Sequence, residues 1–151
     1  MAKLEGIYSF LPLTPSLATA GQPTEGELAA VKAAGYKVVI NLLPATSPNA
    51  LPDEDKIVSA LGMAYVSIPV VWEQPEVADV EQFFDVMDAH QNENVFVHCA
   101  ANMRVSAFVY LHRTVRQHVP PAEAMGDLRR IWTPNETWQG FIDGFGPTKD
   151  K

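Results

Sequence analysis

The chain has 151 residues, of which 47% are hydrophobic and 19% are charged. This length and composition are typical of one globular domain, which would bury roughly two-thirds of the surface that its unfolded chain exposes. Its 11 basic and 18 acidic residues give a net charge of −7, which repels nucleic-acid phosphates and anionic membrane surfaces. We therefore expect a single domain over residues 1–151 that binds neither nucleic acid nor membrane.

From the amino terminus, short apolar runs alternate with amphipathic stretches. Residues 6–11 are expected to form a first strand. Thr24 precedes a helical pattern and Glu27 follows three residues later, the spacing of a helix-capping box. Gly35 is expected to end that helix, and the next strand is expected at residues 38–42.

The same alternation continues through the rest of the chain. The expected elements are a helix within 47–62, a strand at 63–70, a helix within 74–91, a strand at 94–98, a helix from about 104 to about 119, and two helices at 121–132 and 135–145. The strand at 94–98 is nearly all apolar, as in strands buried on both faces of a parallel sheet. The pattern predicts an α/β fold in which helices flank a mainly parallel central sheet, with residues 94–98 in its middle.

Cys99 is the single cysteine of the chain and directly follows the expected central strand. One cysteine forms no internal disulfide, and residues 1–16 show no targeting pattern, so the reducing cytoplasm is the default location, although a chain that has lost a signal peptide would look the same. In open α/β sheets, ligands bind at the carboxyl ends of the strands. A turn entering a helix there points unpaired N–H groups at an anion and favours thiolate over thiol.

The neighbours of Cys99 suit an oxyanion ester as ligand. Arg104 offers a planar fork of donors for phosphate or sulfate oxygens. We expect the backbone of residues 100–104 to bind the anion, and these residues are Ala100, Ala101, Asn102, Met103 and Arg104. His98 could brace the turn through its ring nitrogens. The pattern favours a nucleophilic cysteine over a buried structural one.

A metal site is not expected, and neither is a cofactor. The four histidines, which are His90, His98, His112 and His118, include no pair spaced i, i+4, and there is no second cysteine. We interpret His112 and His118 as solvated positions on a helix.

Three segments resemble one known family. "ATAGQPTEGEL" (18–28), "VVINLLP" (38–44) and "VHCAANMRVSAF" (97–108) together resemble a bacterial cysteine-dependent phosphatase-like family, which is also found as the phosphatase-like domain of β-lactamase hydrolase-like proteins. The resemblance runs from about residue 7 to about residue 118 and implies a dual-specificity-phosphatase-like fold. It implies that Cys99 forms a phosphocysteine, that Arg104 clamps the phosphate of a phosphorylated small molecule or phosphoprotein, and that Ser106 could stabilise the departing thiolate.

The spacing departs from the usual phosphatase signature. Four residues separate Cys99 from Arg104, whereas five are usual, so Val105 would occupy the ordinary place of the arginine. One residue along a helix rotates a side chain by about 100°, so Arg104 must approach the anion from another direction. Asn102 stands where glycine is usual, and asparagine tolerates the left-handed backbone that such a turn requires.

A cysteine phosphatase also needs a general acid for the leaving oxygen. The segment after the strand at 63–70 supplies three candidates, Glu73, Glu76 and Asp79. We choose Glu73, because the neighbouring Trp72 could desolvate its carboxylate, and we interpret Asp79 as a charge on the helix surface.

Two other functions remain open from the sequence. A rhodanese-like sulfurtransferase also places a cysteine on a tight loop and carries a persulfide on it. A catalytically inactive module could bind a phosphorylated ligand through the same loop. Phosphate release, a stable persulfide on Cys99, or binding without turnover would distinguish the three.

Overall fold

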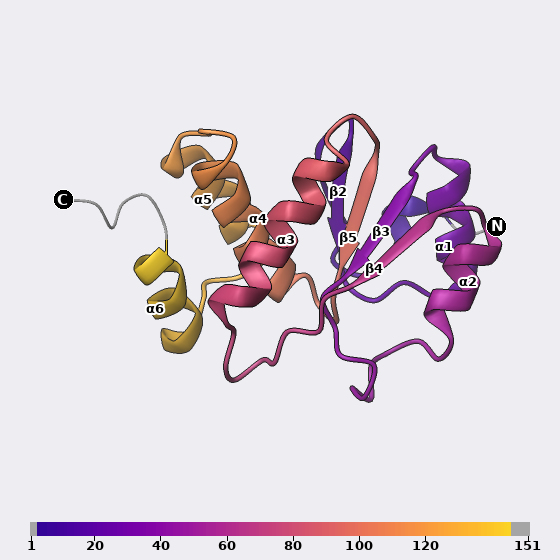
Figure 1. Cartoon of the computed structure of the whole chain (residues 1–151), viewed down its shortest axis with the longest axis horizontal. Coiled ribbons are helices and arrows are strands. Elements are labelled where there is room, and N and C mark those ends of the chain that lie inside the picture. Colours follow the sequence, from indigo (N-terminus) through magenta and orange to yellow (C-terminus); the bar gives the residue numbers. More distant parts are fainter. Residues whose placement is uncertain (1–2, 146–151) are drawn as a thin grey trace.

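The computed structural model describes residues 3–145, which form a central sheet with helices on both faces (Figure 1). The sheet has five strands in the order β1-β2-β5-β3-β4. The strands are β1 (Leu11–Thr14), β2 (Leu17–Ala20), β3 (Val38–Asn41), β4 (Ala64–Ser67) and β5 (Val95–His98). The helices are the 3-10 turn η1 (Leu4–Gly6), α1 (Glu25–Ala33), α2 (Glu54–Ala60), α3 (Val77–Ala89), α4 (Met103–Val115), α5 (Pro121–Arg129) and α6 (Glu136–Phe145).

Four of the five strands are parallel. β5 pairs in parallel with β2 on one side and with β3 on the other, and β3 pairs in parallel with β4. β1 joins the edge antiparallel to β2. The expected α/β class, the mainly parallel sheet and the central position of the strand before Cys99 are therefore confirmed.

The amino-terminal expectation was wrong in part. Residues 4–6 form η1, Ile7 packs into the core, and the first strand begins only at Leu11. β2 was not expected, because all four of its residues are buried and its sequence shows no polar alternation.

Helix α1 begins and ends as the sequence indicated. The Thr24 hydroxyl accepts a hydrogen bond from the Glu27 N–H at 3.1 Å, and the Glu27 carboxylate accepts one from the Thr24 N–H at 2.9 Å. Both halves of the capping box are therefore formed. Gly35 follows the helix with φ +99°, a conformation that favours glycine.

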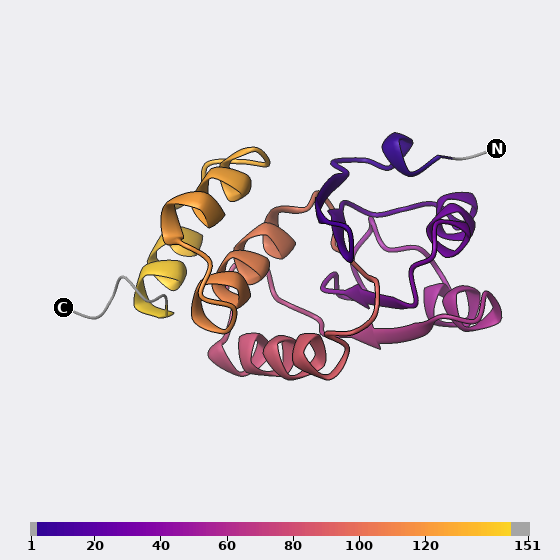
Figure 2. The same cartoon turned by 90° about the horizontal axis from the view of Figure 1, so that it is seen from above.

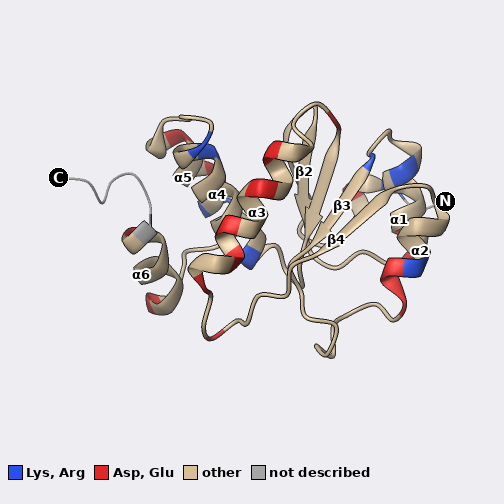
Figure 3. Cartoon of the chain, in the orientation of Figure 1, with Lys and Arg blue, Asp and Glu red and all other residues tan. Residues whose placement is uncertain are grey.

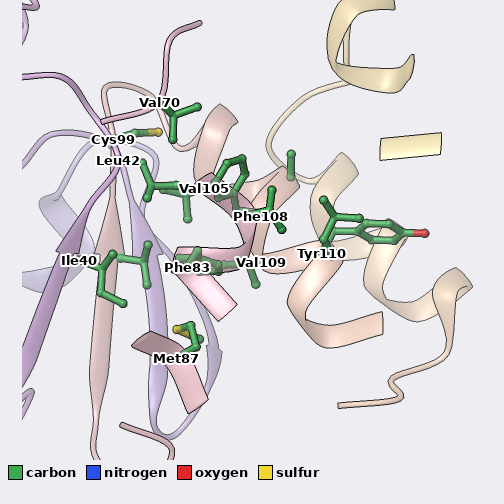
Figure 4. Close-up of a cluster of buried hydrophobic side chains, with 14 of the residues drawn as sticks. Ile40, Leu42, Val70, Phe83, Met87, Cys99, Val105, Phe108, Val109 and Tyr110 are labelled. Carbon is green, nitrogen blue, oxygen red and sulfur yellow. The ribbon is translucent and has the colours of Figure 1, made fainter. Parts of the chain in front are cut away.

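The sheet separates two hydrophobic clusters, and the helices that contribute to them lie on its two faces (Figure 2). The strands carry no Asp, Glu, Lys or Arg (Figure 3). Along β5, Val95 and Val97 belong to the cluster with α3, α4, α5 and α6, whereas Phe96 belongs to the cluster with α1 and α2. This alternation is the period of two that a strand imposes. Figure 4 shows part of the larger cluster, which reaches Cys99.

His112 and His118 differ in their exposure to solvent. His118 is exposed in the turn after the helix, with φ +59°. His112 is buried, and its Nε2 lies 3.0 Å from the Asp88 carboxylate. The interpretation of His112 as solvated was therefore wrong, because α3 packs over that face of α4.

Within the described part of the chain, each helix is too short or too polar to cross a bilayer.

Candidate active site

Cys99 lies immediately after the central strand β5 and before helix α4, at the carboxyl edge of the parallel strands. We call residues 99–104 the cysteine loop. The first backbone hydrogen bond within α4 runs from the Ser106 N–H to the Asn102 carbonyl at 2.8 Å. The N–H groups of Met103, Arg104 and Val105 precede that bond, so they have no partner within the helix. This is the end of a helix that attracts anions.

Asn102 holds the turn between the strand and the helix. Its backbone is left-handed, with φ +67° and ψ 0°, so the expectation that Asn102 tolerates the left-handed backbone of this turn is confirmed. Its buried side-chain amide donates to the Ser9 carbonyl and to the Thr19 hydroxyl, both at 2.9 Å. These two bonds tie the cysteine loop to the amino-terminal part of the chain.

The link between β2 and α1 supports the loop from the side. The Gln22 N–H donates to the Ala100 carbonyl at 3.0 Å, and Gly21 forms an isolated antiparallel bridge with Ala101. A Cβ atom at Gly21 would lie 2.5 Å from the Ala100 oxygen, so only glycine allows this approach. Gly21 and Gln22 of the resembling segment therefore contact the cysteine loop directly.

His98 contacts the turn, as the sequence suggested. Its Nδ1 lies 3.3 Å from the Cys99 carbonyl oxygen, and its Nε2 lies 2.5 Å from Oε2 of Glu54. The other oxygen of Glu54, Oε1, accepts a hydrogen bond from Gln22 Nε2 at 2.9 Å. Sequence reasoning did not identify Glu54, because it lies 44 residues from His98 in a run of charged residues that resembles an ordinary exposed helix start.

Arg104 is half-buried in the first turn of α4 and leans toward the segment between β4 and α3. Its Nε donates to the Val70 carbonyl at 2.9 Å, and its Cζ lies 5.3 Å from the centre of the Trp72 ring. Among the described residues, its two terminal nitrogens have no protein partner. Both nitrogens are therefore available to bind a ligand.

The thiol of Cys99 is covered in this structure. The residue is 0% exposed and belongs to the larger core cluster together with Leu42 and Val70 (Figure 4). We call residues 68–76 the covering loop. It is held by the Arg104 bond to the Val70 carbonyl and by a bond of 2.9 Å from Trp138 Nε1 to the Trp72 carbonyl. Val70 of this loop lies near Cys99 in the cluster, so we expect the sulfur to become accessible to a substrate when the loop moves.

The candidate acids lie on or just after the covering loop. Glu73 is exposed, so Trp72 does not desolvate it here; the indole packs against Trp132 and Trp138 instead. Asp79, expected on the helix surface, is partly buried. Burial and, to a lesser extent, the nearby Glu76 charge raise the pKa of Asp79, which favours its protonated form.

Ser106 has other partners than the thiolate. Its hydroxyl donates to the Met103 carbonyl at 2.7 Å and accepts a hydrogen bond from Trp132 Nε1 at 2.9 Å. Because its one proton is donated to the Met103 carbonyl, the hydroxyl fixes the first turn of α4 in this structure.

Residues 3–145 hold no cluster of three or more His, Cys, Asp or Glu side chains arranged to bind a metal ion.

Comparisons with known proteins identify the family of the chain. Residues 14–137 match the family described as DSP-PTPase phosphatase fused to NAD+ kinase. The phosphatase-like DUF442 protein of Shewanella putrefaciens CN-32 is 41% identical, with a TM-score of 0.86 over 97% of this chain and 93% of that one. A search of curated proteins finds no match.

More distant structures share the fold alone. TpbA of P. aeruginosa, in a cysteine-to-serine form in complex with pTyr, is 15% identical, with a TM-score of 0.73 over 93% of this chain and 86% of that chain. Tk-PTP in its active form is 16% identical, with a TM-score of 0.77 over 91% and 95% of the two chains. Given the match over residues 14–137, the chain belongs to the family of DSP-PTPase phosphatases described as fused to NAD+ kinase.

Proposed function

We propose that this protein hydrolyses a phosphate monoester through a phosphocysteine on Cys99. The observation that carries the proposal is the position of Cys99 at the start of a loop that leads into the N-terminus of α4. Arg104 follows in the first turn of that helix, and its terminal nitrogens have no partner among residues 3–145. Family membership supports phosphatase chemistry over sulfur transfer.

The reaction would proceed in two displacements. The Cys99 thiolate attacks phosphorus, so that an S–P bond forms and the bond to the leaving oxygen breaks. A water molecule then attacks the phosphocysteine, the S–P bond breaks, and phosphate leaves with the thiolate restored. In both steps the N–H groups at the start of α4 and the Arg104 guanidinium stabilise the charge on the equatorial oxygens.

A carboxylic acid would protonate the leaving oxygen in the first step, and the resulting carboxylate would take a proton from water in the second. Glu73 remains our candidate, because it lies on the covering loop, which we expect to move for catalysis. Asp79 is the second candidate, since its raised pKa keeps a proton available closer to neutral pH.

We infer that the substrate carries its phosphate on an aromatic group. The support is the relative TpbA, whose complex contains pTyr. Trp72 and the exposed Val71 on the covering loop offer apolar surface for such a ring.

The test is phosphate release from a generic aryl phosphate by the wild type and three variants. Cys99→Ser should abolish release, and Arg104→Ala should reduce it by about 100-fold or more, whereas Arg129→Ala, which changes an exposed arginine at the end of α5, should leave it unchanged. Sulfur transfer from thiosulfate without phosphate release would support a sulfurtransferase instead. Binding of the aryl phosphate without turnover would indicate an inactive module.

A further inference from the structure

Three residues from three elements meet behind the cysteine loop and have no role in the chemistry described above. Glu54 comes from α2, Gln22 from the link between β2 and α1, and His98 from β5. Glu54 is 4% exposed and His98 is 0% exposed. At that depth neither side chain can touch a substrate. Burying a carboxylate against an imidazole costs desolvation free energy, which only well-formed hydrogen bonds offset.

The hydrogen bonds of this group converge on two carbonyl groups of the cysteine loop. The Cys99 carbonyl faces His98 Nδ1 at 3.3 Å, and the Ala100 carbonyl accepts from the Gln22 N–H at 3.0 Å. A carbonyl that turned toward the anion site would repel a phosphate. Holding both carbonyls back therefore leaves the N–H groups of the loop to face the ligand.

The contact with the Cys99 carbonyl depends on which ring nitrogen carries a proton. A carbonyl only accepts, so the contact is attractive only when Nδ1 is protonated. Glu54 faces the opposite ring nitrogen at 2.5 Å and is itself fixed by Gln22 Nε2 at 2.9 Å. Glu54 thus fixes the orientation of the ring that presents Nδ1 to the loop.

We propose that Glu54 is a positioning residue for the proposed phosphatase: through His98 it holds the cysteine loop in its anion-binding conformation. The inference rests on the proposed function, but its test is the binding of an anion, which requires no turnover. This role depends on the length of the side chain and on its hydrogen bonds to Gln22 and His98. An uncharged side chain of the same length should therefore replace Glu54, whereas a shorter charged side chain should not.

Two conservative variants separate these requirements. In Glu54→Gln, the amide oxygen can still accept from Gln22, and its NH2 can donate to His98 Nε2, which keeps the proton on Nδ1. In Glu54→Asp, the carboxylate is drawn back by about 1.5 Å and cannot reach both partners. Asp88→Asn is the matched control, because Asp88 pairs with the buried His112 at 3.0 Å on the α3–α4 face and makes no contact with the cysteine loop.

The experiment measures the binding of inorganic phosphate by calorimetry, together with the thermal melting of each variant. Glu54→Asp should bind phosphate about tenfold more weakly, the size expected for loss of one hydrogen bond to a charged group. Glu54→Gln should bind within about threefold of the wild type, and Asp88→Asn should lower the melting temperature without changing affinity. Unchanged affinity in Glu54→Asp would overturn the proposal, and so would an equal loss in both Glu54 variants.

A spectroscopic readout reports on His98 even where a variant is less stable. Long-range ¹H–¹⁵N spectra of the imidazole should show Nδ1 protonated in the wild type and in Glu54→Gln, and should show this signal lost or averaged in Glu54→Asp. An Nδ1 without a proton in the wild type would overturn the proposal. A wild type that binds phosphate but releases none from any ester would contradict the proposed function and leave this inference intact.

Discussion

Replacing Trp138 with phenylalanine removes a hydrogen bond that holds the covering loop over Cys99. The indole of Trp138 is fully buried, and its Nε1 donates to the Trp72 carbonyl at 2.9 Å. Because Cys99 is 0% exposed, a thiol reagent reacts only with molecules in which an opening exposes the sulfur, and we expect that opening to be a movement of this loop. The alkylation rate therefore measures the opening equilibrium.

The lost hydrogen bond sets the minimum size of the effect, because the Trp138 ring also packs against the Trp72 ring, with 5.5 Å between ring centres. A hydrogen bond between neutral groups contributes about 1 kcal/mol to the closed state, which corresponds to about a fivefold change in an equilibrium constant. Trp138→Phe should therefore accelerate iodoacetamide modification of Cys99 by at least about fivefold. The measurement is the loss of free thiol with time at fixed pH and reagent concentration.

Trp132→Phe provides the control. Trp132 packs in the same aromatic cluster, 5.4 Å from Trp72 between ring centres, but its Nε1 donates to the Ser106 hydroxyl in α4 and not to the covering loop. Its alkylation rate should stay within about twofold of the wild type. Equal acceleration in both variants, in step with their losses of unfolding free energy, would show that the thiol is reached by global unfolding and would refute the loop account.

Three further predictions concern the surroundings of the site. Asn102→Ala should unfold in urea with about 1 kcal/mol less stability than Asn102→Gly, because both variants lose the same amide bonds and only alanine resists a φ of +67°; equal stabilities would contradict this. Gly21→Ala should weaken phosphate binding by pushing on the Ala100 carbonyl, whereas Gly26→Ala, where a Cβ meets nothing within 4 Å, should not, as calorimetry can show. Burial lowers the pKa of His112 below its usual 6.5, so the unfolded chain binds the proton more readily and unfolding free energy should fall as pH drops below about 6.5. Denaturation series above and below that pH should show this loss in the wild type and a smaller one in His112→Gln.

Local patterns predicted much of the fold. The nearly all-apolar run before Cys99, the Thr24 and Glu27 capping pair and the left-handed Asn102 were each identified from sequence, because each depends on neighbours within a few residues. β1 and β2 were not identified as a pair, since their sequences, LPLT and LATA, contain few of the β-branched and aromatic residues that mark β3 and β5, and β1 contains a proline.

The contacts that build the site are mostly non-local, which is why the sequence did not predict them. Glu54 reaches His98 across 44 residues, and Arg104 reaches the Val70 carbonyl across 34 residues. No spacing rule relates such positions in a single sequence. The exposure of Glu73 likewise depends on Trp72 packing against Trp132 and Trp138, which only the folded chain determines.

The central claim is that Cys99 carries the phosphoryl group during turnover. Rapid chemical quench of the wild type mixed with an aryl phosphate, followed by peptide mass spectrometry, tests it directly. The account predicts a phosphoryl group on the peptide that contains Cys99, formed before phosphate accumulates and absent from Cys99→Ser. Phosphate release by Cys99→Ser at the wild-type rate, or turnover with no phosphoryl group on that peptide, would contradict it.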